Sequence, residues 1–327
     1  MAGLLYHGLH SQSQWWDWPQ DVRQELQQLF QAALAQELLR SHHLENILEI
    51  FATRGIPCIL LKGEALARTH YAIPSIRARA DCDLFIDIAD IAKARQAVLD
   101  AGLNIVSPVY KSHQFTVRRT LKDLDVFEFD MHWRILNNPR YARVLDFAQA
   151  YANSLAAPGL EPARVLQPGD ALLHACMHRV ANAAHDCDRL IWTYDIHVLV
   201  AALTPRQLQD FAQRAVRRGV QAACLSGLMA ARTCLHTQWP DAVTVALSRP
   251  APEETWSRRF AESHLALLLD DWKHLSDGKA RRAMLRELFL PPAESLASRY
   301  GHASRRWLPW LYVRHVLGGL SARLTLR

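Results

Sequence analysis

A chain of 327 residues, half of them apolar and about a fifth charged, has the composition of a folded globular protein rather than a disordered one. Its length is enough for two domains, or for one domain with helical additions. No apolar run approaches the roughly 18 residues that a membrane-spanning helix needs, and the N-terminus lacks the pattern of a secretory signal. We therefore expect a cytoplasmic protein without a transmembrane segment.

The net charge of +6 is concentrated at the C-terminus. Between Ser295 and Arg327 there is no acidic residue, whereas there are six arginines, with Trp307, Trp310 and Tyr312 among them. Such a segment suits an anionic partner, such as RNA, an anionic membrane surface or an acidic protein. It equally suits an amphipathic helix packed on the protein's own surface, and the sequence leaves both readings open.

Residues 19–53 carry apolar side chains at three- and four-residue spacings, which is the period of an amphipathic helix. We predict a helical segment over residues 1–53, ahead of the first strand. The pattern then changes, because residues 56–61 form a short apolar run that ends at Lys62 and Gly63. This run is typical of a buried strand followed by a turn. A short, alanine-rich helix should come directly after the turn.

Two later segments alternate between polar and apolar residues, as strands do. In residues 80–88, Asp81 and Asp83 alternate with apolar residues and should point to the same face. The alternation is clearest in residues 125–135. One face there carries Phe127, Phe129, Met131, Trp133 and Ile135, and the other carries Glu128, Asp130, His132 and Arg134. Each strand is therefore expected to turn one face to the core and a polar face away from it.

Strand patterns end near residue 151, and helical spacing continues from residue 170 to at least residue 288. We predict an α+β protein in which a small mixed-sheet core is flanked by helices on both sides in sequence. Its four expected parts are an N-terminal helical segment (1–53), the mixed-sheet core (54–150), a larger helical domain (151–290) and a basic C-terminal tail (291–327).

Asp81, Asp83 and Asp130 have the residue type and placement of a metal-binding carboxylate set. Two aspartates two positions apart on a strand lie about 6 to 7 Å apart on one face, which suits a pair of ions roughly 4 Å apart. Mg²⁺ prefers oxygen ligands of this kind. Asp130 is the carboxylate best placed on the polar face of the second strand. An Asp-x-Asp pair alone is a weak signal, since it is also common at solvated strand ends.

The expected elements run as strand, Lys62-Gly63 turn, short helix, Asp-x-Asp strand, helix, and a strand with one further carboxylate. The accompanying motifs are Leu61-Lys62-Gly63, Tyr71, Pro74, Arg77, Asp81-Cys82-Asp83-Leu84 and Asp130-Met131-His132-Trp133-Arg134, and more faintly Pro168, Asp170, Leu173, His174, His178, Arg189, Trp192 and Asp195. This order resembles the nucleotidyltransferase fold shared with DNA polymerase beta. The motifs are similar to those of the stand-alone bacterial proteins called uncharacterised nucleotidyltransferases, over residues 45–200.

The resemblance implies transfer of a nucleotidyl group from a nucleoside triphosphate such as ATP, with Mg²⁺ or Mn²⁺ as cofactor. It assigns the metal and catalytic roles to Asp81, Asp83 and Asp130, and nucleotide contacts to Lys62, Gly63, Arg77, His132 and His178. The wider superfamily has a Gly-Ser turn at the position of Lys62-Gly63, so a lysine charge would replace a hydroxyl at the phosphates. The acceptor stays open among a peptide, a small molecule, a protein and RNA.

Two other functions stay open. The first is a metal-dependent phosphohydrolase, because His178, His185, Asp186 and Asp195 have the residue types of the helical His, His-Asp, Asp metal site. The seven-residue spacing from His178 to His185 is short for ligands that come from separate helices. The second is a protein that binds a nucleotide or a partner without catalysis, although none of the three aspartates of the core is missing. Metal-dependent thermal stabilisation by a nucleoside triphosphate would help to separate these alternatives.

Overall fold

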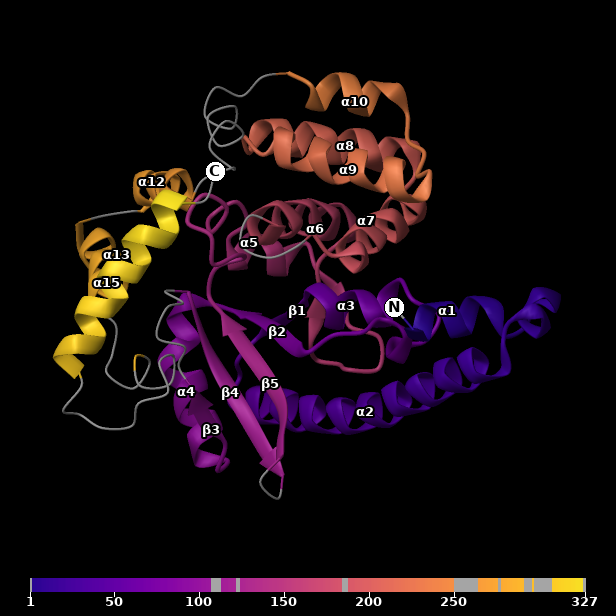
Figure 1. Ribbon diagram of the computed structural model, residues 1–327, viewed down its shortest axis with the longest axis horizontal. Coiled ribbons are helices and arrows are strands. Elements are labelled where there is room, and N and C mark those ends of the chain that lie inside the picture. The colour runs from indigo at the N-terminus through magenta and orange to yellow at the C-terminus, as the bar shows by residue number, and fades with distance from the viewer. Residues whose placement is uncertain are drawn as a thin grey trace.

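A seven-stranded mixed sheet forms the centre of the molecule, in the order β3-β4-β5-β2-β1-β7-β6. The computed structural model describes residues 2–106, 113–121, 124–183, 188–249, 264–275, 278–290, 296 and 308–325. The strands are β1 (Cys58–Leu61), β2 (Asp81–Ile86), β3 (Asn104–Val106), β4 (Gln114–Leu121), β5 (Leu124–His132), β6 (Leu155–Ala156) and β7 (Arg164–Val165). Helices pack on both faces of this sheet (Figure 1), which confirms the α+β class.

The central strand β2 has one antiparallel and one parallel neighbour. It pairs antiparallel with β1 and parallel with β5. Beyond β1 the sheet continues with β7, which is parallel to β1, and then with β6. The sequence pattern, in which strands end near residue 151, did not predict these last two strands. Each contains only two residues, which is too short to produce an alternating pattern.

The first helices precede the sheet in the chain. They are α1 (Ala2–Leu9), a 3₁₀ turn (Ser13–Asp17) and the 34-residue helix α2 (Gln20–Thr53). Most buried residues of α2 lie in its C-terminal half, where Leu44, Ile47 and Phe51 pack in one hydrophobic cluster with the sheet. This half of α2 therefore forms a layer against one face of the sheet.

Alternation along the central strands divides the core into two clusters. Leu60 and Leu84 belong to the cluster that contains α2. Their neighbours Ile59, Leu61 and Phe85 point the opposite way and belong to a second cluster, which includes residues from the C-terminal helices. The sheet is thus packed between α2 on one face and the helical region on the other.

The remaining helices lie between and after the strands. They are α3 (Lys62–Thr69), α4 (Ile91–Asp100), α5 (Phe147–Ala152), α6 (Pro168–Ala183), α7 (Leu190–Ala202), α8 (Pro205–Arg217), α9 (Gln221–Leu235), α10 (Asp241–Leu247), α12 (His264–His274), α13 (Gly278–Phe289) and α15 (Leu308–Thr325), with 3₁₀ turns at Pro74–Ile76 and Ile88–Asp90. In Figure 1, α8, α9 and α10 stack beyond α6 and α7, and α12, α13 and α15 gather at one side.

Part of the basic tail folds as α15 and packs against α13. Leu311 is fully buried there, and the Nε2 atom of His315 lies 3.2 Å from the backbone carbonyl of Leu288. For this part of the tail, the structure therefore shows a helix packed on the protein's own surface. Arg299, Arg305, Arg306 and Arg327 lie outside the described residues, and an anionic partner stays a prediction. None of the described helices combines the length and apolarity needed to cross a membrane.

Candidate active site

The predicted carboxylates meet on neighbouring strands. β2 and β5 are parallel, and their register sets Asp83 beside Asp130. Asp81, two positions before Asp83, lies on the same face. The opposite face of β5 carries Phe129 and Met131, which are buried in the cluster with α2. The strand alternation predicted from the sequence is confirmed, although β5 ends at residue 132 and not at residue 135.

Lys62 brings a positive charge to these carboxylates. It lies directly after β1 and is the first residue of α3, so the turn predicted at Lys62 and Gly63 is the first turn of a helix. Its φ of +49° is unusual for a residue with a side chain and costs conformational energy. In this conformation its Nζ atom lies 2.5 Å from Oδ1 of Asp83.

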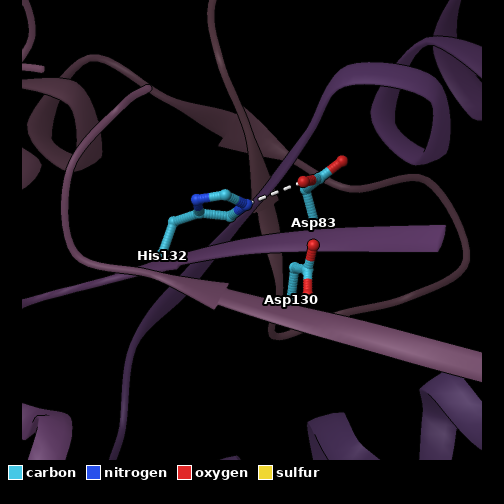
Figure 2. A group of neighbouring side chains, drawn as sticks. All are labelled: Asp83, Asp130 and His132. Carbon is cyan, nitrogen blue, oxygen red and sulfur yellow. Dashed lines mark hydrogen bonds and ion pairs between the residues drawn. The ribbon is translucent and has the colours of Figure 1, made fainter. Parts of the chain in front are cut away.

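His132 contacts the same carboxylate. Its Nε2 atom lies 2.7 Å from Oδ1 of Asp83, and Figure 2 shows the imidazole ring directed at this oxygen, with Asp130 alongside. Ligand atoms of Asp83, Asp130 and His132 all lie within 4.8 Å of one another, so this group has the composition and spacing of a metal site. The hydroxyl of Thr116 donates a hydrogen bond of 2.5 Å to Oδ1 of Asp130 and orients that carboxylate.

The electrostatics of the cluster follow from burial and from opposite charges. Burial opposes the charge of Lys62, but Asp83, Asp81 and Asp130 outweigh it and raise the pKa of the ammonium. Burial likewise opposes the charge of Asp83, but Lys62 and His132 outweigh it and hold the pKa of this carboxyl well below its usual range. The pKa of Asp81 is raised, first by repulsion from Asp83 and then by burial. The cluster therefore holds excess negative charge that a cation would relieve.

A cleft of about 460 Å³ opens over the carboxylates. One end is bounded by Lys62 and Gly63 from the β1–α3 junction, and the loop after β5 bounds another part with Asn137 and Asn138. The other lining residues include Arg77, Arg79, Asp81, Asp83, Asp130, His132, His178, Asn182, Arg189, Ile191, Trp192 and Asp271. The structure thus brings to one cleft every residue that the resemblance assigned to metal or nucleotide contacts.

Arg77 lines the cleft but is also part of a buried ion pair. Its Nε and Nη2 atoms donate to the two carboxylate oxygens of Asp195 at 2.8 and 2.6 Å. The hydroxyl of Tyr71 donates to the same carboxylate at 2.7 Å. Asp195 belongs to α7, so this contact joins the loop before β2 to the helical region.

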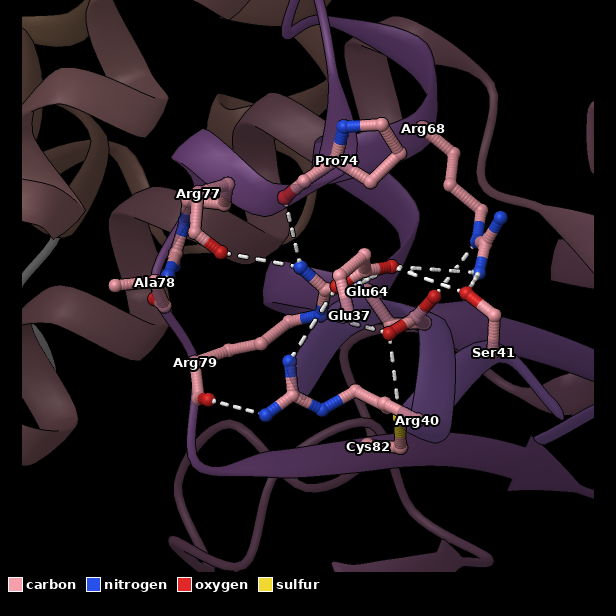
Figure 3. A network of polar contacts seen from close by, with 10 residues as sticks. All are labelled: Glu37, Arg40, Ser41, Glu64, Arg68, Pro74, Arg77, Ala78, Arg79 and Cys82. Carbon is pink, nitrogen blue, oxygen red and sulfur yellow. Dashed lines mark hydrogen bonds and ion pairs between the residues drawn. The ribbon is translucent and has the colours of Figure 1, made fainter. Parts of the chain in front are cut away.

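A second buried network supports the loop that leads into β2 (Figure 3). Arg79 donates to both carboxylate oxygens of Glu37, each at 2.7 Å, and to Glu64 at 2.7 Å. Arg68 donates to the other oxygen of Glu64 at 2.7 Å, and Arg40 donates to the backbone carbonyl of Arg79 at 2.8 Å. The network ties α2 and α3 to the start of the Asp-x-Asp strand. Sequence reasoning missed it because its members are far apart in the chain.

The two candidate histidines of α6 are uncharged at neutral pH. Burial, and then the charge of Lys62, lower the pKa of His174 to about 3 and hold the pKa of His178 well below its usual range. His178 packs edge-on against Trp192 with 5.2 Å between ring centroids, and the Arg189 guanidinium lies 5.3 Å from the centre of the same indole ring. His178, Arg189 and Trp192 line the cleft on its helical side.

The rival metal site has a different arrangement. His185 and Asp186 lie outside the described residues. Both carboxylate oxygens of Asp195 are bonded within the Arg77 and Tyr71 contacts. The group of candidate metal ligands found among the described residues is the one on β2 and β5, not one in the helices. The observed geometry therefore favours chemistry at the sheet.

Carboxylates on adjacent strands, beside a cationic helix start in a polar cleft, define a site that suits a metal-chelated phosphate substrate. Comparison with protein-family models agrees with this class of site. The model of the family described as uncharacterised nucleotidyltransferase matches residues 1–236, and the chain belongs to this family. Comparisons with the curated proteins and with the solved structures gave no match.

Proposed function

We propose that this nucleotidyltransferase moves a nucleoside monophosphate from a nucleoside triphosphate to an acceptor, with Mg²⁺ or Mn²⁺ held by Asp81, Asp83 and Asp130. The observation that carries the proposal is the register of β2 and β5, which sets Asp83 beside Asp130. These two side chains and Asp81 line one cleft with Lys62. An exposed strand edge would need neither this convergence nor a cationic partner for a buried carboxylate.

The charges of the cluster fit a divalent cation. Asp81, Asp83 and Asp130 supply the oxygen ligands that Mg²⁺ prefers, and the raised pKa of Asp81 reflects repulsion from Asp83. When bound, the metal would neutralise triphosphate charge and stabilise the attacking and leaving oxygens.

Lys62 and Gly63 would hold the β- and γ-phosphates. The ammonium group of Lys62 lies at the start of α3, where backbone N–H groups also favour negative charge. Gly63 lets the start of α3 pack closely on the loop before β2, because a Cβ atom there would lie 3.3 Å from Cβ of Arg79 and 3.4 Å from the Arg77 guanidinium. On binding the triphosphate, the Lys62 ammonium would contact phosphate oxygens in place of Asp83.

On the helical wall, neutral His178 and the Trp192 ring would contact the nucleoside, while His132 orients Asp83 through its 2.7 Å contact. Asp130, oriented by Thr116, would accept the proton of the attacking group. The acceptor's lone pair forms a bond to the α-phosphorus, and the bond from that phosphorus to the bridging oxygen breaks. Pyrophosphate leaves with the bonding electron pair.

The test is incubation with Mg²⁺ and each α-labelled nucleoside triphosphate, with and without cell extract, beside Asp83→Asn. We expect label transfer and pyrophosphate release by the wild-type protein, with a loss of about 100-fold or more in the variant, since a metal contributes several kcal/mol of transition-state stabilisation. Equal transfer by both proteins would remove Asp83 from the site. Label that appears only in nucleoside mono- or diphosphate, with no labelled acceptor, would favour a hydrolase.

A further inference from the structure

Helix α12 reaches the catalytic cleft from outside the matched family region. The family model ends at residue 236, whereas α12 spans His264–His274. Even so, Asp271 of this helix lines the cleft together with Asp81, Asp83 and Asp130. Its place in the cleft is not explained by the nucleotide-binding roles proposed above.

A buried ion pair fixes α12 against the loop after β5. Arg140 donates from Nε and Nη2 to the two carboxylate oxygens of Asp270, at 2.9 and 2.7 Å. Both side chains are less than a tenth exposed, so this contact is a specific docking point and not a loose surface pair. The next residue, Asp271, accepts a hydrogen bond of 3.3 Å from Nδ2 of Asn138.

Asp271 is set apart from the metal ligands. It comes from α12, whereas the proposed metal ligands Asp81, Asp83 and Asp130 lie on β2 and β5. Burial, and then the neighbouring charge of Asp270, raise the pKa of Asp271 to about 7. A carboxyl group whose pKa is raised by burial in a cleft is typical of functional sites.

The order of the strands gives the cleft a direction. β5, β2 and β1 lie side by side in that order, so Lys62 marks the β1 side. The loop with Asn137 and Asn138 marks the β5 side, since Asn137 donates to Gln114 at the start of β4, the strand beyond β5. Attacking and leaving oxygens lie roughly in line across the transferred phosphorus. If Lys62 holds the pyrophosphate, the acceptor approaches from the side where α12 docks.

We propose that Asp271 binds the acceptor by accepting a hydrogen bond from its hydroxyl or amine group, and that the acceptor is a small molecule or a protein side chain and not the end of an RNA strand. This rests on the proposed function. The β5 side presents the amides of Asn137 and Asn138 and the carboxyl of Asp271, and the charge of Arg140 is paired with Asp270. A phosphodiester chain would be repelled there by the carboxylate of Asp271.

The experiment compares the wild-type protein with Asp271→Asn, and with Asp210→Asn as a control that changes an exposed carboxylate on α8. Each is given an α-labelled triphosphate and one of three fractions of a cell extract: a small-molecule filtrate, RNase-treated protein, or total RNA. Triphosphate affinity is measured separately by thermal shift. We expect label in one of the first two fractions, and a rate at low acceptor concentration that falls about tenfold or more in Asp271→Asn.

Triphosphate affinity should stay unchanged in this variant, and a high acceptor concentration should restore its rate, because the defect is in acceptor binding. Asp270→Asn weakens the ion pair that docks α12, and it should therefore also lower the rate. Label in RNA, an unchanged rate in Asp271→Asn, or a parallel loss of triphosphate affinity would each overturn the proposal. Triphosphate binding without transfer to any fraction by the wild-type protein would contradict the proposed function itself.

Discussion

At the scale of single residues, Lys62 links backbone conformation to charge. Its backbone has a positive φ, which costs conformational energy, and its ammonium group contacts Asp83, which is electrostatically favourable. The sequence predicted a lysine charge at this turn because of the motif. It did not predict the left-handed backbone, since nothing in the residue type favours one.

Lys62→Ala should lower the stability of the metal-free protein by about 3 kcal/mol, because buried Asp83 loses its cationic partner. Lys62→Gly removes the same charge but also relieves the positive φ, and should be more stable than Lys62→Ala by about 1 kcal/mol. Mg²⁺ should stabilise both variants more than the wild type. Denaturant unfolding of the wild type and both variants, with and without Mg²⁺, measures these differences. Equal stability of the alanine and glycine variants would contradict backbone strain at position 62.

At the scale of elements, two buried polar contacts hold the loop between α3 and β2. Arg79 binds Glu37 and Glu64 below it, and Arg77 binds Asp195 of the helical region. The sequence showed these arginines and glutamates as charged residues in helical or loop segments, and only folding brings them together. Their burial makes each partner necessary to the others.

Arg79→Met should destabilise the protein by about 3 to 5 kcal/mol, because it leaves Glu37 and Glu64 buried without this counter-charge. The matched control is Arg54→Gln, which removes an ion pair with Asp100 whose side chains are more than two-fifths exposed. That change should cost far less, because an exposed ion pair contributes little to stability. Thermal or denaturant unfolding compares the two, and similar losses would argue against a buried network.

Asp195→Asn separates the two roles of Arg77. If Arg77 mainly joins α7 to the core, Asp195→Asn should lose stability, and its triphosphate binding should fall only as far as the fraction of folded protein falls. If Arg77 also binds phosphate, releasing its guanidinium from Asp195 should leave affinity intact, and Arg77→Lys should reduce it through loss of the two-pronged contact. Calorimetric titration of the triphosphate into each folded variant distinguishes these outcomes.

At the scale of the whole molecule, the cleft draws on segments from across the chain. The start of α3, β2 and β5 supply the charged centre, α6 and α7 supply the helical wall, and α12 supplies Asp271. The sheet itself carries one core on each face, and the carboxylates lie on the face opposite α2, toward the helical region.

Asp271→Asn should stabilise the protein at pH 8 but not at pH 4. The folded-state pKa of about 7 exceeds the ordinary value of 3.8, so the stability contributed by protonated Asp271 is present below pH 4 and is lost as the pH rises through 7. The cause is burial and then Asp270, with Arg140 opposing and His274 also near Asp270. The gain should not exceed about 4 kcal/mol. Denaturant unfolding at both pH values measures it, and an equal gain at pH 4 would point to another cause.

The sequence by itself determined the α+β class, the two alternating strands and the membership of the family, because period-two alternation and local motifs are properties of neighbouring residues. The tertiary structure decided what depends on distant contacts. It placed Asp83 beside Asp130, bonded Arg77 to Asp195, extended the sheet with β7 and β6, and brought Asp271 to the cleft. These pairings join residues tens to more than a hundred positions apart, and local sequence patterns carry no information about such distances.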